Sequence, residues 1–361
     1  MLRQTDSRSV WNSSRRGPRP SRQGSRRDGK FAAALLGKIE TVSDLPSCYA
    51  LGMRTRFRGI TERQGMVWRG AVGWAEWSPF LDYRGTELVP WLRAAEEAAE
   101  RGWPAPIRTA IPVNSAVPAV GPEEAYAIAR AAGCGTAKVK VAERGQSLAE
   151  DAARLEAVRG ALGPAGKIRI DANGGWAVDQ AQRAIRQLAH FDLEYAEQPC
   201  ATVEELADLR QRLARAGLNV LIAADESIRR TEDPFQVAEQ EAADIAVLKV
   251  QPLGGVRACL EIAQRIGLPV VVSSALETSI GIRAGLALAA ALPELPYACG
   301  LNTVALLTDD LVIEPLIAVD GVISLRDPVV DESAISNHQP SHQVQQFWQA
   351  RLVHTRELTG G

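Results

Sequence analysis

The chain has 361 residues, of which 46% are hydrophobic and 23% are charged. This length exceeds that of one small domain and suits a large barrel with a smaller partner domain. No apolar run approaches the ~20 residues that a membrane-spanning helix needs, so we expect no membrane insertion.

The formal net charge of −2 conceals an asymmetry. Residues 1–30 carry eight Arg and one Lys against two Asp, a net of +7, which leaves −9 for the remainder. A mildly acidic body argues against nucleic-acid binding. Residues 1–44 are predicted to be a disordered basic tail. Such a tail could be an inert extension, an electrostatic interaction arm or a targeting peptide, although it lacks the apolar region of a secretory signal.

The cysteines are scattered, odd in number and without CxxC spacing, which argues against a disulfide framework or a zinc site. They are Cys48, Cys134, Cys200, Cys259 and Cys299. This usage is typical of reduced thiols in a cytoplasmic protein.

Residues 45–105 are predicted to form a small α+β domain. Residues 45–78 are strand-like and rich in turns, which indicates an antiparallel sheet. Residues 85–101 have apolar side chains at helical spacing. The last segment, residues 313–361, reads as strand, turn and polar helix, and we expect it to return to the N-terminal domain.

Residues 106–312 alternate short apolar runs with amphipathic helices every ~25–30 residues, which is typical of parallel βα units. The expected strands are a run within 108–117 and residues 137–141, 168–172, 193–197, 220–224, 245–250, 270–273 and, more weakly, 298–301. The expected helices include residues 148–162, 178–189, 203–216, 234–241 and 255–266. Eight such units close a barrel. An open doubly wound sheet is the alternative, but no Gly-x-Gly-x-x-Gly follows the early strands. The predicted fold is α/β: a modified TIM (β/α) barrel with an α+β capping domain built from both chain ends.

Polar residues stand where five successive predicted strands end. They are Lys138 and Lys140, Asp171, Glu197, Asp225, and Lys249. The carboxyl ends of barrel strands meet at one mouth, where active sites of this architecture lie. The two-residue period of a strand puts Lys138 and Lys140 on one side, and likewise Asp171 and Asn173.

Three carboxylates that converge without His or Cys form a hard oxygen site, which suits Mg²⁺. Lysines on either side of them suit proton transfer next to a carboxylate, where a metal and an ammonium stabilise an enediolate. Taken singly, each residue has a plainer interpretation: Asp171 as a helix cap, Glu197 as a turn residue, Lys249 as half of a structural ion pair. Those interpretations do not explain five residues at the same phase of five successive units.

In chain order these motifs resemble the muconate-lactonising subgroup of the enolase superfamily. They are Lys138-Val139-Lys140, Asp171-Ala172-Asn173, Glu197-Gln198-Pro199, Ala224-Asp225-Glu226-Ser227 and Leu248-Lys249-Val250. The resemblance covers about residues 45–325. The sequence around these motifs, together with residues 57–61 and 77–83, is similar to the sequences of the actinobacterial o-succinylbenzoate synthase family.

The resemblance implies roles for each residue. It implies that Asp171, Glu197 and Asp225 bind Mg²⁺, with Mn²⁺ able to substitute. It implies that Lys140 is the base and then the acid.

The remaining implied roles are supporting ones. Lys249 would stabilise the enediolate and Lys138 would tune Lys140. Supporting or substrate-facing roles fall to Asn173, Glu226, Ser273 and Ser274, the two serines as backbone donors near the substrate.

The implied activity is that of a carbon–oxygen lyase. It would dehydrate a cyclohexadiene carboxylate, a small-molecule substrate, to 2-succinylbenzoate in menaquinone biosynthesis. Two alternatives stay open. The same site with two lysine bases could serve an N-succinylamino acid racemase or a dipeptide epimerase, although no acidic residue stands near residues 298–303 to hold a dipeptide's amine. A barrel without activity could act as a binding protein. The sequence leaves the oligomeric state undetermined.

Overall fold

The described part of the chain, residues 46–231 and 233–359 of a computed structural model, begins with a three-stranded antiparallel sheet. Its strands are β1 (Ser47–Phe57), β2 (Ile60–Arg69) and β3 (Trp74–Trp77). Arg58 and Gly59 join β1 to β2, and both have positive φ, as a tight hairpin turn requires. The predicted antiparallel sheet is therefore confirmed. The tail predicted for residues 1–44 lies outside the described residues.

Helix α2 (Val89–Glu100) packs against this sheet. A 3-10 turn, η3 (Gly85–Leu88), leads into this helix, which has a proline in its first turn. Trp91 and Leu92 of α2 are fully buried. The helix predicted over residues 85–101 is confirmed.

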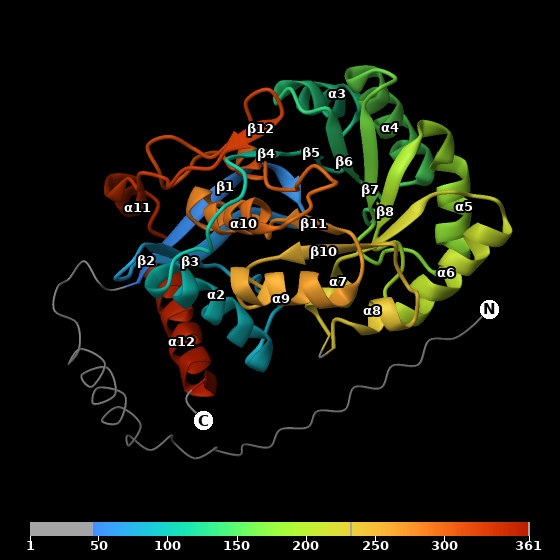
Figure 1. The fold of residues 1–361 in the computed structure, drawn as a ribbon. Coiled ribbons are helices and arrows are strands. Elements are labelled where there is room, and N and C mark those ends of the chain that lie inside the picture. Colours follow the sequence, from blue (N-terminus) through green and yellow to red (C-terminus); the bar gives the residue numbers. More distant parts are fainter. Residues whose placement is uncertain (1–45, 232, 360–361) are drawn as a thin grey trace, which may run out of the picture. The chain divides into compact units, whose positions relative to one another are not determined.

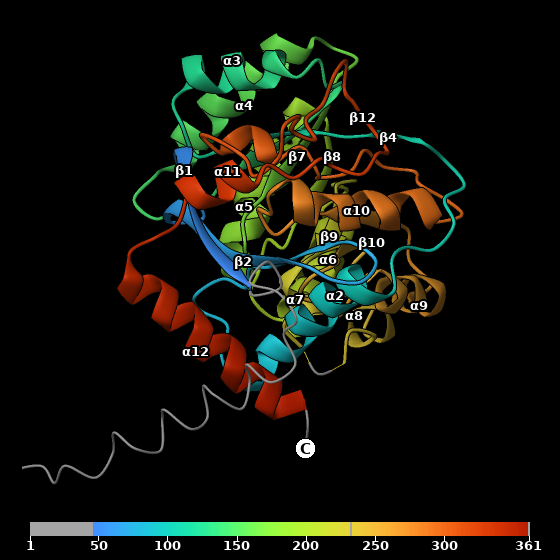
Figure 2. The ribbon, with the colours of Figure 1, turned by 90° about the vertical axis from the view of Figure 1, so that its left-hand side faces the viewer.

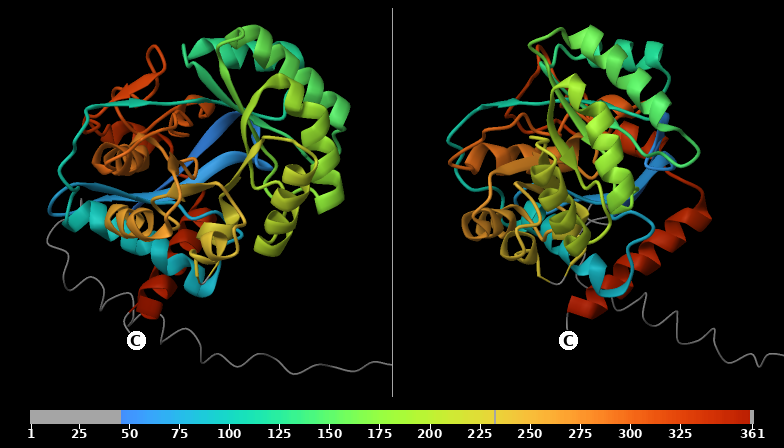
Figure 3. Two further views of the ribbon diagram at one scale, coloured as in Figure 1. Left: turned by 45° about the vertical axis from the view of Figure 1, so that its right-hand side comes forward. Right: turned by 90° about the vertical axis from the view of Figure 1, so that its right-hand side faces the viewer.

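Seven parallel strands form the central sheet, with helices on its outer side (Figures 1 and 3). In spatial order they are β11 (Val270–Ser273), β10 (Ile245–Lys249), β9 (Leu221–Ala224), β8 (Leu193–Glu197), β7 (Lys167–Asp171), β6 (Thr136–Lys140) and β5 (Ser115–Val117). The order runs backwards through the chain without a reversal, as in a barrel and unlike a doubly wound sheet. The parallel βα architecture predicted from the sequence is confirmed.

The helices of this region follow the strands in alternation. They are α3 (Pro122–Ala131), α4 (Leu148–Leu162), α5 (Val178–Leu188), α6 (Val203–Arg215), α7 (Glu226–Arg229), α8 (Gln236–Glu239), α9 (Val256–Ile266) and α10 (Ser279–Ala291), with short 3-10 turns η4 (Ala189–Phe191) and η5 (Val304–Leu306). Ser147 caps α4 and Thr202 caps α6, each paired with a Glu three residues later. These capping boxes satisfy backbone N–H groups and explain where the two helices begin.

Two features of the helix pattern differ from the prediction. The helix expected over residues 234–241 is only the single turn of α8. Helix α10 was not among those predicted, because nearly all of its side chains are buried and it lacks the polar face that marks an amphipathic helix.

The eighth strand, predicted over residues 298–301, is not a regular strand. Cys299 makes a single parallel bridge to Val113, before β5, and Gly300 makes another to Ser273, at the end of β11. These two bridges join both edges of the sheet. A Cβ on Gly300 would lie 2.6 Å from Ser273 Oγ, so this close approach requires glycine, which weakens a regular strand.

The C-terminal segment returns to the N-terminal sheet, as predicted. After β12 (Val322–Ser324), which pairs with β4 (Ala110–Pro112), come α11 (Glu332–Asn337) and α12 (His342–Thr359). Figure 2 shows α12 beside α2. Trp348 of α12 is fully buried, meets Trp77 edge-to-face at 5.6 Å between ring centroids, and donates to Gln64 Oε1 at 3.0 Å.

The described residues from 46 onward form one compact unit, so the domain boundaries predicted near residues 105 and 312 stay predictions. Within those residues, no helix is long and apolar enough to cross a bilayer.

Glu76 of β3 joins the N-terminal sheet to the barrel. Its carboxylate accepts hydrogen bonds from the N–H groups of Thr278 (3.1 Å) and Gly281 (3.0 Å) at the start of α10, and from Tyr49 Oη at 2.7 Å. A carboxylate at a helix N-terminus is stabilised by the unpaired N–H groups there. Burial nevertheless raises the pKa of Glu76. Glu277 lies beside it, and burial together with the Glu76 charge raises the pKa of Glu277 to about 7.

Replacing Trp348 with Ala removes the largest side chain that α12 buries against the N-terminal sheet. We expect Trp348→Ala to lower the free energy of unfolding by about 3–5 kcal/mol, measured by denaturant titration. Its neighbour Phe347 is 50% exposed and serves as the matched control, with an expected loss below about 1 kcal/mol for Phe347→Ala. Equal losses for both variants would contradict this packing.

Glu277 predicts a pH dependence of stability. Because its folded pKa, about 7, exceeds its ordinary value of 4.5, the folded state holds a proton that the unfolded state releases. Proton binding by Glu277 therefore adds to the free energy of unfolding, on the order of 3 kcal/mol. This stabilisation is fully present below pH 4.5 and is lost as the pH rises through 7. Arg63 and the N–H of Ala275, which face the same carboxylate, oppose the shift without cancelling it.

Glu277→Gln should remove this component, so that the variant gains stability relative to the parent chain as the pH rises from 5 to 8. Thermal unfolding at each pH measures it. The exposed Glu261→Gln is the control and should leave the profile unchanged. Parallel profiles for the parent chain and Glu277→Gln would contradict the raised pKa.

Candidate active site

The strand-end residues meet at one end of the central sheet. In the register of β6, β7 and β8, Lys140 lies opposite Asp171, and Asp171 lies opposite Glu197. Asp225 follows β9 directly, and Lys249 is the last residue of β10. The structure therefore brings together the lysines and carboxylates that the sequence analysis singled out.

Two lysines of β6 reach the carboxylates of the neighbouring strands. Lys138 Nζ lies 2.7 Å from Glu197 Oε1 and 3.6 Å from Asp171 Oδ2, and Lys140 Nζ lies 3.3 Å from the same Asp171 oxygen. All four side chains are largely buried. Lys138 thus links two carboxylates, whereas Lys140 contacts only one.

Asp225, fully buried, is held from the other side. Lys249 Nζ lies 2.6 Å from Asp225 Oδ2, and Arg229 Nε lies 2.8 Å from Asp225 Oδ1. The side-chain amide of Gln198 accepts from the backbone N–H of Asp225 at 2.9 Å. The carboxylate is therefore fixed in position and in charge.

The two outer lysines share an unusual electrostatic setting. Burial lowers the pKa of Lys140, and the nearby Arg58 and Lys138 charges lower it further, against the opposing pull of Asp171. Burial likewise lowers the pKa of Lys249, against the pull of Asp225. A lysine with a depressed pKa is able to act as a base.

Lys138 behaves in the opposite way. Burial would lower its pKa, but Glu197 and Asp171 outweigh burial and raise the pKa of Lys138 above its ordinary value. Burial would raise the pKa of Asp171, but Lys140, Lys138 and Lys249 hold it below its ordinary value. Lys138 is therefore a fixed cation, and its charge is one of those that depress the pKa of Lys140.

Asn173 and Glu226 lie at the rim of this cluster. Asn173 has a positive φ, its N–H donates to Asp171 Oδ1 at 3.0 Å, and its side-chain amide donates to Glu226 Oε1 at 3.2 Å. Arg58, from the β1–β2 hairpin, contacts the same Glu226 oxygen at 3.3 Å. Asn173 and Glu226 thus connect Asp171 to the N-terminal hairpin.

A small cavity of about 30 Å³ opens at the strand ends. Its lining comes from the barrel and from the N-terminal domain: Phe57, Arg58, Phe80, Asn114, Ala116, Lys138, Asp171, Asn173, Lys249, Ser273, Ser274, Leu276, Gly300 and Thr303. An outer cavity of about 490 Å³ shares Arg58 and Phe80 with it. Residues of the N-terminal domain line both spaces, and the inner one is the smaller of the two.

Ser273 and Ser274 line the inner cavity. The Ser274 N–H donates to the Gly300 carbonyl at 3.1 Å, and its Oγ pairs with Thr303 Oγ1 at 2.6 Å. The backbone amide of Ser274 that was expected to face a substrate is therefore engaged within the protein.

The carboxylates fit a divalent metal by their chemistry. Glu197 Oε2 is buried and has no hydrogen-bond partner among the described residues, so one carboxylate oxygen of the cluster is unpaired. Hard oxygen donors suit Mg²⁺-type cations. Across residues 46–231 and 233–359, no three His, Cys, Asp or Glu side chains surround a common point, because lysine ammonium groups lie between the carboxylates.

Arg229, Gln198 and Asn114 were not assigned individual roles from the sequence. Arg229 stands four residues after Asp225 on α7, a spacing that puts both on one helix face and could have signalled the pair. Gln198 lies within the Glu197-Gln198-Pro199 motif, but its bonds to Asp225 and Ser227 depend on the tertiary structure.

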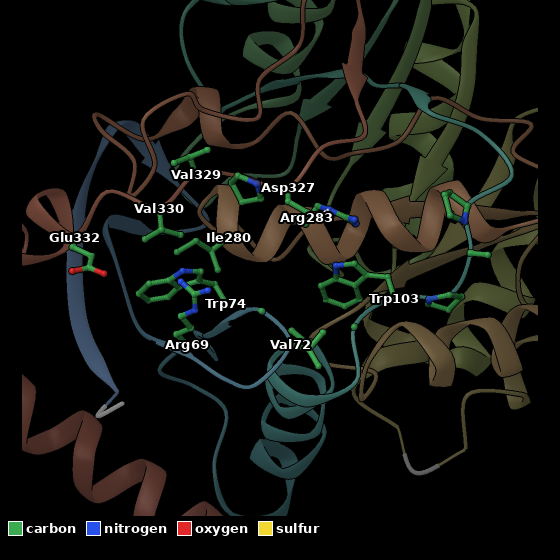
Figure 4. Close-up of a pocket in the computed structure, with 17 residues that line it drawn as sticks. Arg69, Val72, Trp74, Trp103, Ile280, Arg283, Asp327, Val329, Val330 and Glu332 are labelled. Carbon is green, nitrogen blue, oxygen red and sulfur yellow. Dashed lines mark hydrogen bonds and ion pairs between the residues drawn. The ribbon is translucent and has the colours of Figure 1, made fainter. Parts of the chain in front are cut away.

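A separate cavity of about 640 Å³ lies away from these residues (Figure 4). Trp74, Trp103, Ile280 and Arg283 are among its lining residues, and it contains none of the strand-end carboxylates or lysines. The convergence of ionisable groups, and not cavity size, locates the candidate active site.

Comparisons with known proteins agree with this geometry. The family model described as "Enolase N-terminal domain-like" matches residues 48–99, and "Enolase C-terminal domain-like" matches residues 122–328. A muconate lactonising enzyme from Pseudomonas fluorescens superposes with a TM-score of 0.69 at 20% identity, covering 82% of this chain and 99% of that one. An N-succinyl Arg/Lys racemase from Bacillus cereus superposes equally well at 19% identity, covering 82% and 97%. Both likenesses support the fold.

Relatives at higher identity narrow the family. A protein of Thermobifida fusca named o-succinylbenzoate synthase is 60% identical over 308 residues, 85% of this chain and 95% of that protein. A protein of the same name from Mycolicibacterium smegmatis is 52% identical over 84% of this chain and 92% of its own length. The chain belongs to the o-succinylbenzoate synthase family of the enolase superfamily.

Proposed function

We propose that the chain is an o-succinylbenzoate synthase, a hydro-lyase that converts 2-succinyl-6-hydroxy-2,4-cyclohexadiene-1-carboxylate to 2-succinylbenzoate in menaquinone biosynthesis. The observation that carries the proposal is the 60% identity, over 95% of its length, to a protein of that name. The lysines and carboxylates at the strand ends give the proposal its chemistry.

The metal is proposed to be Mg²⁺, held by Asp171, Glu197 and Asp225, with Mn²⁺ able to replace it. When bound, the cation supplies positive charge that stabilises an enediolate formed from the substrate carboxylate. The unpaired Glu197 Oε2 and the all-oxygen donor set support this assignment.

Lys140 is proposed as the base. In its neutral form Nζ takes the proton α to the ring carboxylate, and the electron pair moves into the enediolate. The resulting Lys140 ammonium then returns that proton to the departing hydroxyl, which leaves as water and restores neutral Lys140. Since one group serves both steps, the proton and the hydroxyl leave from the same face. The depressed pKa of Lys140 favours the neutral starting form.

Lys249 and Lys138 are proposed to act as cations. Lys249 enters from β10, on the far side of β7–β9 from Lys140, and its ammonium stabilises the enediolate. Lys138, whose pKa is raised by Glu197 and Asp171, remains charged and keeps the pKa of Lys140 low. Asn173 and Glu226 support Asp171 at the rim, and Ser273 and Ser274 line the substrate cavity.

The facing positions of Lys140 and Lys249 also favour a second candidate activity. Two bases on opposite faces of a carbon acid are what racemisation of an N-succinylated amino acid requires, with one removing and the other returning the proton. A paired assay with Mg²⁺, on the cyclohexadiene carboxylate and on an N-succinylamino acid, discriminates the two. Faster dehydration supports the proposed function, and faster racemisation would overturn it in favour of the racemase.

Lys140→Met should lower kcat for dehydration by at least ~10³-fold, because the base and the acid are the same group. Metal affinity, measured by calorimetry, should stay close to that of the parent chain. Lys167→Met, at the opposite end of β7, is the control and should retain full activity. Substantial turnover by Lys140→Met would refute the assigned role.

Asp225→Asn should weaken Mg²⁺ binding by about 10-fold or more, since a charged metal ligand becomes neutral. Calorimetric titration of the metal-stripped protein measures this directly. The exposed Asp179→Asn should bind Mg²⁺ as the parent chain does. An unchanged affinity for Asp225→Asn would remove this residue from the proposed ligand set.

A further inference from the structure

Arg63 is a buried arginine of β2 that reaches out of the N-terminal sheet to the loop following β11. It is 2% exposed. Its Nε donates to the Leu276 carbonyl at 3.0 Å, and its Nη2 donates to the Ala275 carbonyl at 3.1 Å and to Ser78 Oγ at 2.9 Å. A further bond from Nη2 reaches the Ser78 carbonyl. One side chain thus ties two loops together.

The acceptors around Arg63 are carbonyl and hydroxyl oxygens. Within the described residues no carboxylate lies at ion-pair distance from it. The buried carboxylates of Glu76 and Glu277 nevertheless lie near enough for the Arg63 charge to counteract the rise in pKa that burial causes in each, and together with the hydrogen bonds they offset the cost of burying the guanidinium. An apolar side chain would leave the carbonyls of Ala275 and Leu276 without this donor, so the guanidinium fixes the position of that loop as well as filling the interface.

The loop that Arg63 holds forms one wall of the active-site cavity. Ser274 and Leu276 both line that cavity. Leu276 has a φ of 63°, in the left-handed region that side chains other than glycine rarely adopt. Such a conformation persists when its surroundings hold it, and Arg63 Nε holds the carbonyl of this residue.

Ser78, the other partner of Arg63, connects the guanidinium to two other parts of the cavity lining, one near Lys249 and one at Phe80. Its N–H donates to Gln251 Oε1 at 3.1 Å, and Gln251 Nε2 donates to Ser78 Oγ at 3.2 Å. Gln251 follows the proposed catalytic Lys249 by two residues. On the other side, Ser78 lies two residues before Phe80, which also lines the cavity.

We propose that Arg63 is a positioning residue for the reaction, which sets the substrate-facing wall at Ser274 and Leu276 against Lys249 through Ser78. Arg63 does not touch the substrate and binds no metal. Through its hydrogen bonds, Arg63 fixes the position of the loop after β11 relative to the N-terminal sheet, and that loop shapes the pocket. This inference rests on the proposed function for its kinetic test.

The test compares Arg63→Met and Arg63→Lys with Arg159→Met. Arg159, on α4, is the matched control because its guanidinium also donates to carbonyls of two loops: Gly163 at 3.0 Å and Gly166 at 2.6 Å before β7, and Phe191 at 2.5 Å before β8. Those loops lie at the amino ends of the strands, away from the proposed site. Each variant is assayed for KM and kcat of dehydration, Mg²⁺ affinity and thermal stability.

We expect Arg63→Met to raise KM and lower kcat/KM by about 10–100-fold, because a pocket wall displaced by ~1 Å misplaces the substrate. Mg²⁺ affinity should be unchanged, and Arg63→Lys should recover part of the loss. Arg159→Met should lose stability without a change in kcat/KM. A kcat/KM for Arg63→Met within twofold of the parent chain would overturn the inference and leave Arg63 a structural residue.

Hydrogen exchange of the backbone amides of residues 274–278 provides a readout that does not depend on activity. Exchange should accelerate in Arg63→Met and stay unchanged in Arg159→Met. If the parent chain fails to dehydrate the cyclohexadiene, the proposed function fails, and exchange alone decides the inference: unchanged exchange overturns it. If Arg63→Met does not fold, Arg63→Lys carries both measurements, and parent-like kinetics and exchange in that variant overturn the inference.

Discussion

The buried cluster of lysines and carboxylates at the strand ends is the constraint on which the rest of the molecule depends. Removing ionic groups from water costs several kcal/mol each, and charges of opposite sign at close range, together with hydrogen bonds, offset this cost. Lys138 meets this condition by bridging Glu197 and Asp171, and Lys249 and Arg229 meet it for Asp225. The barrel supplies the required closeness, because parallel strands in register bring their carboxyl ends to one edge.

The same constraint divides the lysines into two kinds. Lys138 faces two carboxylates, so its pKa is raised and its charge is permanent. Lys140 faces one carboxylate and two neighbouring cations, so burial prevails and its pKa falls. Two side chains on one strand, two residues apart, therefore have opposite acid–base properties. Their difference comes from how many carboxylates each one reaches, and it supports the proposed roles of Lys138 as a cation and Lys140 as the base.

The N-terminal domain completes the site. Phe57, Arg58 and Phe80 close the small cavity over the strand ends, and Arg58 also contacts the rim residue Glu226. Glu76 caps α10, and α12 returns to pack Trp348 under the N-terminal sheet. The N-terminal sheet thus packs against both the barrel and the C-terminal helix. Arg63 of this sheet contacts the loop after β11.

Several elements were predictable because their signals are local. The alternation of apolar runs and amphipathic helices predicted the βα order, and α4 was predicted with its observed bounds. Strand β8 was predicted over its observed residues as well. The α10 helix and the irregular eighth segment were not, because an all-apolar helix has no polar face and because Cys299 and Gly300 pair only through isolated bridges to residues distant in the sequence. The tertiary structure overrides local pattern at both places.

The sequence by itself determined the fold class and a cluster of carboxylates flanked by lysines near the ends of parallel strands, made of Lys138, Lys140, Asp171, Glu197, Asp225 and Lys249. Those inferences need only the periodicity of strands and the rule that parallel strands end together. Only the tertiary structure decided which ammonium pairs with which carboxylate, that Arg229 and Gln198 hold Asp225, and that Arg63 reaches the Ser274–Leu276 wall. Such contacts join residues as many as 213 positions apart, and their distances depend on sheet register and domain packing, which no local pattern of residues encodes.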